Sequence, residues 1–142
     1  MRILPLTSTG RLLLSVLLLA LLSGCALFRS GPDFATLSGE AVSETPSRTP
    51  IDQAARLEVQ LLDVTEGRIL VAQVSQRAEA GLPVPFTLQY DRHRLDPDRR
   101  YALSAALETR GVTRYVTPSP LPVLTFDAPT ENVRLPLAPV TP

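Results

Sequence analysis

The sequence predicts an all-β fold, a small antiparallel β-sandwich of seven to eight strands with Greek-key, immunoglobulin-like connections. Three observations predict it. Apolar residues recur at every second position in short segments, turn residues separate these segments at regular intervals, and the chain has 14 prolines and no tryptophan. Alternation with a period of two is typical of strands that bury one face, and many short strands are typical of sandwiches. We assign this domain to residues 35–142.

The first half of the domain contains four expected strands. They lie at residues 35–42, 57–64, 69–76 and 86–90. The second of them has Leu57, Val59 and Leu61 on one face and polar residues on the other, which is the pattern of a half-buried strand. The segment 43–52, rich in proline, serine and threonine, connects the first strand to the second, and Glu66-Gly67 makes a turn before the third.

The second half contains four more expected strands. They lie at residues 101–109, 112–117, 123–126 and 132–139. Arg110-Gly111 predicts a tight hairpin turn. The segment 118–122, "PSPLP", is expected to interrupt the ladder because proline has no N–H to donate.

One segment of this half allows an alternative. Residues 100–110 could form a helix, because alanine and leucine are good helix formers. The strand is favoured because apolar residues alternate strictly and turns flank the segment closely. The strand would place four residues on one face, namely Tyr101, Leu103, Ala105 and Leu107.

The first 24 residues have the anatomy of an export signal. Arg2 and Arg11 form a basic head, residues 12–22 are apolar except for Ser15, and two small residues follow. These are the parts of a signal peptide, and the apolar run is shorter than the roughly 20 residues that span a bilayer. A buried core helix is the alternative, but it would need a polar face, which 12–22 lacks. We expect residues 1–24 to be removed on export.

The tetrapeptide Leu22-Ser23-Gly24-Cys25 resembles the lipobox of bacterial lipoproteins. In that motif the signal peptidase recognises the three residues before the cysteine, whose thiol carries the lipid and becomes the mature N-terminus. The only cysteine of the chain falls at the required position; the alternative is an ordinary signal peptide with an incidental cysteine. The resemblance implies a membrane partner through acyl chains on Cys25, since two or more chains make a stable anchor. Residues 25–34 would be the lipidated N-terminus and tether.

The single cysteine also limits the other sites that this chain can build. It allows no intramolecular disulfide and no cysteine-based zinc site. Ala26, rather than aspartate, follows the cysteine. In many enteric bacteria an aspartate there retains lipoproteins at the inner membrane, so the resemblance implies the periplasmic face of the outer membrane.

The charges and the single histidine give no indication of an enzyme or of a nucleic-acid partner. Loss of Arg2 and Arg11 would leave 12 arginines against 14 acidic residues, without the basic stripe of nucleic-acid-binding proteins. His93 lies between Arg92 and Arg94, whose charges disfavour a catalytic imidazolium, and no G-x-S-x-G motif is present. We expect a solvated loop histidine, no enzymatic activity, no cofactor and no small-molecule substrate.

Three aspartates near His93 could be imagined as calcium ligands. Asp91, Asp96 and Asp98 lack the spacing of an EF-hand loop, and four arginines lie within the same ten residues, 91–100. The sequence therefore favours a charge-paired turn over a metal site.

Four segments of the domain resemble the YbaY/YscW-type envelope lipoproteins, which include the lipoprotein chaperones (pilotins) of type III secretion. They are "LEVQLLDV", "GLPVPFTLQYD", "LDPDRRYALSAALE" and "PVLT", within about residues 35–138. The most specific pieces are turn and strand signatures, namely Pro83-Val84-Pro85-Phe86, Tyr90-Asp91 and Asp96-Pro97 with Tyr101.

That resemblance implies a compact β-sandwich on a lipid anchor. Pilotins assist the outer-membrane assembly of secretin rings, so it also implies a non-catalytic binding or chaperone module for another envelope protein. The alternative is a structural or stress-related outer-membrane lipoprotein without a dedicated client. Fold supports function only weakly, so both classes stay open at the level of sequence.

Overall fold

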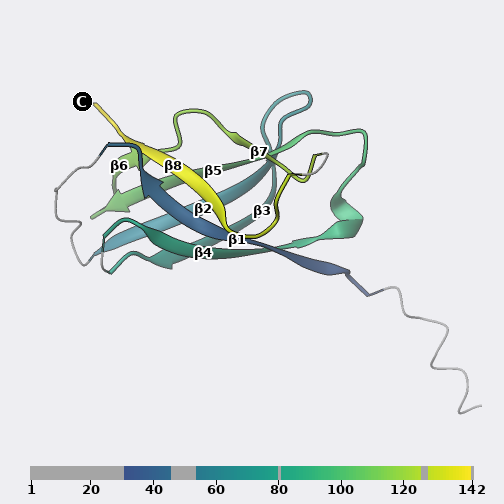
Figure 1. Ribbon diagram of the computed structural model, residues 1–142, viewed down its shortest axis with the longest axis horizontal. Coiled ribbons are helices and arrows are strands. Elements are labelled where there is room, and N and C mark those ends of the chain that lie inside the picture. The colour runs from purple at the N-terminus through teal and green to yellow at the C-terminus, as the bar shows by residue number, and fades with distance from the viewer. Residues whose placement is uncertain (1–30, 46–53, 80, 126–127, 142) are drawn as a thin grey trace, which may run out of the picture. The chain divides into compact units, whose positions relative to one another are not determined.

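The computed structural model describes residues 31–45, 54–79, 81–125 and 128–141, and this part of the chain forms eight strands and one short 3-10 helix (Figure 1). The elements are β1 (Phe34–Ser43), β2 (Ala55–Asp63), β3 (Ile69–Arg77), β4 (Val84–Asp91), η2 (Arg92–Arg94), β5 (Tyr101–Thr109), β6 (Val112–Val116), β7 (Leu121–Val123) and β8 (Val133–Pro139). The predicted all-β fold is confirmed. The alternative of a helix at 100–110 is wrong, because β5 occupies that segment.

The strands form one rolled sheet in the order β3-β2-β5-β6-β8-β1-β4, with β7 paired to β5 beside β6. Figure 1 shows β4, β1 and β8 crossing in front of β2, β3 and β5, so the roll has two layers around one core. Every pair is antiparallel except β1 with β8, which run parallel. The sheet is therefore mixed at that pair, where the sequence predicted antiparallel strands throughout.

The inward face of each long strand is made by alternate apolar residues, as predicted for β2 and β5. Ten side chains fill the interior almost without contact with solvent, namely Leu37, Leu57, Leu61, Leu88, Leu103, Leu107, Leu135, Leu137, Val59 and Val123. Each buried leucine contributes about 1.5–3 kcal/mol relative to exposure. The interior of the roll is thus a packed core and not a ligand cavity.

Two chain reversals in the second half follow from local conformation. Arg110 and Gly111 both adopt left-handed backbone, with φ of 54° and 75°, which is the turn that joins β5 and β6 in two residues. The strand expected at 123–126 lies earlier, because Leu124 has a φ of 58° and ends it. Pro122 is accommodated inside β7 because that strand pairs only with β5.

The roll stays open between its two end strands, β3 and β4, and we call this opening the seam. Within the described strands no backbone hydrogen bond joins β3 to β4. Two side chains bridge the seam instead: Gln76 Nε2 donates to the carbonyl oxygen of Pro85, and Arg94 Nη1 donates to that of Val71 at 2.8 Å. Unpaired edges invite pairing with other chains, and these side chains occupy part of the edge.

The seam leads to a prediction for amide exchange. Because the Pro85 carbonyl faces the seam, alternation along β4 turns the N–H groups of Thr87 and Gln89 the same way, whereas those of Phe86 and Leu88 pair with β1. Unpaired amides exchange without strand opening. We expect Thr87 and Gln89 to exchange at least about tenfold faster than Phe86 and Leu88 in hydrogen–deuterium exchange followed by NMR. Equal protection of the two pairs would contradict an open seam.

Candidate functional site

A row of apolar residues crosses the outer face of the sheet, on the side away from the core. Strand register aligns Leu70 on β3 with Leu62 on β2, Leu62 with Ala102 on β5, and Ala102 with Pro122 on β7. Leu62 and Ala102 follow inward-facing residues of their strands and lie outside the core cluster, yet they are only 6% and 2% exposed. The outer face of the sheet therefore carries a small buried apolar patch that is separate from the core.

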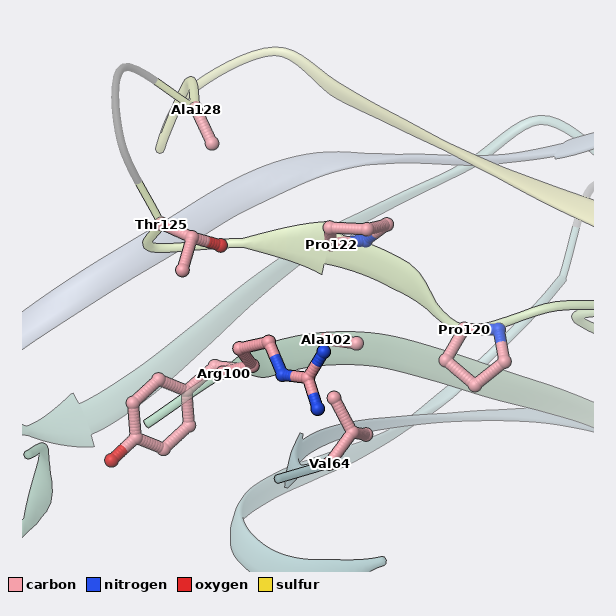
Figure 2. A pocket seen from close by; sticks show the side chains of 8 residues that line it. Val64, Arg100, Ala102, Pro120, Pro122, Thr125 and Ala128 are labelled. Atoms are coloured by element: carbon pink, nitrogen blue, oxygen red, sulfur yellow. The ribbon is translucent and has the colours of Figure 1, made fainter. Parts of the chain in front are cut away.

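Two residues of this row, Ala102 and Pro122, line a pocket of about 540 Å³ (Figure 2). Its lining residues come from the end of β2, from β5, and from the segments around β7. They are Val64, Arg100, Tyr101, Ala102, Pro120, Pro122, Thr125 and Ala128. Most of these side chains are apolar, and Figure 2 shows the Arg100 side chain extending toward Val64 and Ala102. The pocket thus combines apolar walls with one cationic group.

The edge of the pocket is fixed by hydrogen bonds between the end of β2 and the start of β5. The N–H of Val64 donates to the carbonyl oxygen of Arg100 at 2.8 Å, and the N–H of Arg100 donates to Thr65 Oγ1 at 2.8 Å. These bonds use the backbone of Arg100 and leave its side chain outside them. Within the described residues the guanidinium of Arg100 has no hydrogen-bond or ion-pair partner.

Next to this edge, Asp63 is the buried acidic residue of the described chain, at 6% exposure. Its Oδ1 accepts the N–H of Thr65 at 2.9 Å, and its Oδ2 accepts Arg99 Nη1 at 2.8 Å. The Thr65 N–H, and after it the Arg99 side chain, lower the pKa of Asp63 from 3.8 to about 2. The same ion pair raises the pKa of Arg99. The Asp63–Arg99 ion pair thus lies at the end of β2, and the two charges neutralise each other.

The lowered pKa predicts an acid-dependent contribution of Asp63 to stability. Because the unfolded chain binds this proton more tightly than the folded one, the contribution is complete above pH 4 and is lost as the pH falls toward 2. We expect Asp63→Asn to lower the melting temperature at pH 7, and the difference from the parent to shrink between pH 4 and pH 2. Thermal melts across this range measure it, and parallel curves for the two proteins would contradict the assignment.

The turn before β5 is held by a tyrosine and by one charge pair, and that pair agrees with the charge-paired turn predicted for residues 91–100. The N–H of Asp96 donates to Tyr101 Oη at 2.8 Å, and the N–H of Asp98 donates to Asp96 Oδ1 at 2.9 Å. Arg99 Nε lies 3.9 Å from Asp96 Oδ2. The Asp96 carboxylate therefore stabilises the turn, through the N–H of Asp98 and the side chain of Arg99.

His93 and its neighbours form a second small hydrogen-bonded unit. Asp91 Oδ1 accepts the N–H of His93 at 3.0 Å and lies 3.4 Å from its Nδ1. The histidine side chain is 67% exposed, which matches the solvated loop histidine predicted from the sequence. Among the residues that the structure describes, no three His, Cys, Asp or Glu side chains gather closely enough to hold a metal ion.

These strands and turns lie almost entirely within a segment that a known family shares. The family described as type III secretion system lipoprotein chaperone (YscW) matches residues 34–135. This chain belongs to that lipoprotein chaperone family. The resemblance stated from the sequence is confirmed, and its signature Pro83-Val84-Pro85-Phe86 marks the entry to β4.

A solved structure shares the fold of this chain. It is described as an alternative pilotin from the type II secretion system of Vibrio cholerae, and its TM-score against this chain is 0.71. The two are 23% identical, and the likeness covers 78% of this chain and 100% of the pilotin. At this identity the comparison shows the shared fold. No curated protein matches the chain significantly.

The lipidation site predicted for this chain lies outside the described residues. That holds for Cys25 and for Leu22, Ser23 and Gly24 before it. In the described part of the chain, no helix has the length and apolar character needed to cross a membrane.

Sequence reasoning did not find the outer pocket. Its signal was present in the lining residue Ala102 and in Leu62, aligned with it on β2, two apolar residues at positions where the alternation of β2 and β5 predicts outward side chains. The proline segment 118–122 was interpreted only as an interruption, although Pro120 and Pro122 line the pocket.

Proposed function

We propose that this chain is a lipid-anchored, non-catalytic, pilotin-like chaperone that binds a secretion-system protein at the periplasmic face of the outer membrane. The observation that carries the proposal is the match to the lipoprotein chaperone family over residues 34–135. The fold shared with a protein described as a pilotin supports it. By analogy with pilotins, the client is a secretin, the protein that forms the outer-membrane ring.

The anchor in this proposal is Cys25. Signal peptidase would recognise Leu22, Ser23 and Gly24, remove residues 1–24, and leave a lipidated cysteine joined to the folded domain through the tether at 25–34. Two or more acyl chains hold a protein stably on a membrane. The anchor would keep the chaperone at the surface where its client inserts.

Replacing Cys25 tests the anchor. We expect Cys25→Ser to move the protein from the membrane fraction to the soluble fraction, because the thiol that carries the lipid is lost, while its circular dichroism spectrum stays that of a β-protein. Ser23→Ala keeps a small residue before the cysteine and is the matched control, which should stay on the membrane. A Cys25→Ser protein that still sediments with membranes would contradict lipid anchoring at this residue.

Co-expression with a secretin tests the client. We expect the secretin to assemble into multimers in the outer membrane when this chain is present and to assemble less, or in the inner membrane, when it is absent. Semi-denaturing gels of separated membranes measure both. Unchanged assembly with every secretin of the same genome would contradict the chaperone proposal and favour a structural lipoprotein without a dedicated client.

A further inference from the structure

We propose that the outer pocket binds an apolar side chain of the client that stands next to an acidic residue, with the carboxylate of that residue on Arg100. The idea that the ligand is a client protein rests on the function proposed above. The chemistry of the pocket stands on the geometry of the described residues alone.

The interior of the roll has no room for a side chain of the client. Ten apolar side chains from six strands fill it with less than 2% exposure each, and interiors packed in this way have few voids larger than a water molecule. An apolar group of a client must therefore bind on the outside. The outer pocket of about 540 Å³ lies within the range of roughly 300–1,000 Å³ that is typical of ligand sites.

The walls of the pocket fit an apolar side chain. Ala102 is small, 2% exposed and part of the lining, so a larger side chain there would occupy the space that a ligand needs. Along the register row, Leu62 and then Leu70 continue the apolar surface toward β3, and Leu70 is 43% exposed. A leucine or phenylalanine of a partner would bury this surface together with its own.

The charge at the pocket fits a carboxylate. Arg99 is already paired with Asp63 and lies near Asp96, whereas the guanidinium of Arg100 has no such partner within the described residues. A guanidinium at the side of an apolar pocket favours a ligand that carries a carboxylate beside its apolar group. Because Arg100 is exposed, the expected gain in affinity is only about two- to fivefold.

Acetylated dipeptide amides provide a direct test on the mature chain, residues 25–142, carrying Cys25→Ser. We expect Phe-Asp to bind about two- to fivefold more tightly than Phe-Asn, which has nearly the same shape but no charge, and Ala-Asp to bind more weakly than either. NMR titration gives the affinities and should show the largest shifts at Val64, Ala102 and Ala128. Equal affinities for Phe-Asp and Phe-Asn, or shifts elsewhere on the domain, would overturn the proposal.

Two variants with a matched control separate the apolar and charged parts of the pocket. Arg100→Gln should remove the preference for Phe-Asp over Phe-Asn. Ala102→Leu should fill the pocket and abolish binding of both, whereas Ser104→Leu adds the same side chain on the same face of β5, outside the pocket lining, and should not. Binding that survives Ala102→Leu in a folded protein would overturn the proposal, and the titration of the parent decides the matter if that variant does not fold.

The outcome for the pocket can be told apart from the outcome for the proposed function. Dipeptide binding with the expected preference supports the pocket chemistry even if every secretin assembles without this chain. Conversely, a secretin that needs this chain for assembly but assembles equally well with Ala102→Leu would overturn the pocket as the client site and leave the proposed function in place.

Discussion

Replacing Gly39 by alanine is expected to destabilise the domain by about 3 kcal/mol, which urea denaturation of the two proteins measures. Gly39 lies in the middle of β1, where it is aligned with Phe86 on β4 and with Val133 on the parallel strand β8. A Cβ at this position would lie 2.0 Å from the carbonyl oxygen of Val133 and within 3 Å of its backbone carbon and nitrogen. Backbone atoms cannot rotate away as a side chain can, so β1 and β8 would have to separate.

The neighbouring contacts make that separation costly. The N–H of Ser38 donates to the carbonyl oxygen of Thr130 at 3.0 Å, so the chain leading into β8 is held against β1 just before the close approach. Glu40→Ala, one residue further along the strand at an exposed position, is the control and should stay within about 0.5 kcal/mol of the parent. A Gly39→Ala protein as stable as this control would show that β1 and β8 are more widely spaced than described.

The same glycine shows why the positions of the strands could be predicted better than the pairing between them. Local alternation was enough to predict β5 at 101–109 and β2 within two residues of its bounds, because inward and outward positions differ strongly in polarity there. The glycine in "ATLSGEAV" was visible inside the first strand. A glycine is needed there because β8, which lies beside β1 but far from it in the sequence, comes too close for a side chain. No local sequence pattern predicts the register between strands so far apart in the sequence. The parallel β1–β8 pair was missed for the same reason.

The candidate site depends still more on register. Leu62, Ala102 and Pro122 become neighbours only when β2, β5 and β7 are aligned, and each residue alone is unremarkable in the sequence. The pairing of charges predicted for 91–100 holds in part, because Arg99 lies near Asp96 within this segment but also pairs with Asp63 outside it, and Arg100 has no ion-pair partner within the described residues. Cys25 is the converse case, since its role is predicted from a local motif alone and needs no tertiary contact.

Tyr101 is the second position where a large effect is expected. Two substitutions separate the contribution of its ring to stability from that of its hydroxyl. Tyr101→Ala should cost about 4 kcal/mol, because it removes a ring that is only 3% exposed and leaves a cavity between the core and the pocket. Tyr101→Phe should cost about 1 kcal/mol, because it removes only the oxygen that accepts the N–H of Asp96 at 2.8 Å. Urea denaturation of the three proteins gives both values.

The difference between the two variants bears on why Asp96-Pro97 and Tyr101 occur together in this chain. If the hydroxyl serves to hold the turn 95–100 against β5, Tyr101→Phe should release that turn while the strands stay intact. Faster amide exchange of Asp96 without faster exchange of Leu103, whose N–H lies within the sheet, would report this. Unchanged exchange of Asp96 in Tyr101→Phe would contradict this role of the hydroxyl, and equal costs for the phenylalanine and alanine variants would contradict the contribution of the buried ring to the core. Because the turn carries Arg99 and Arg100, its release should also loosen the Asp63 pair and the charged side of the pocket. The tyrosine therefore connects the family signature in the sequence to the site proposed for the client.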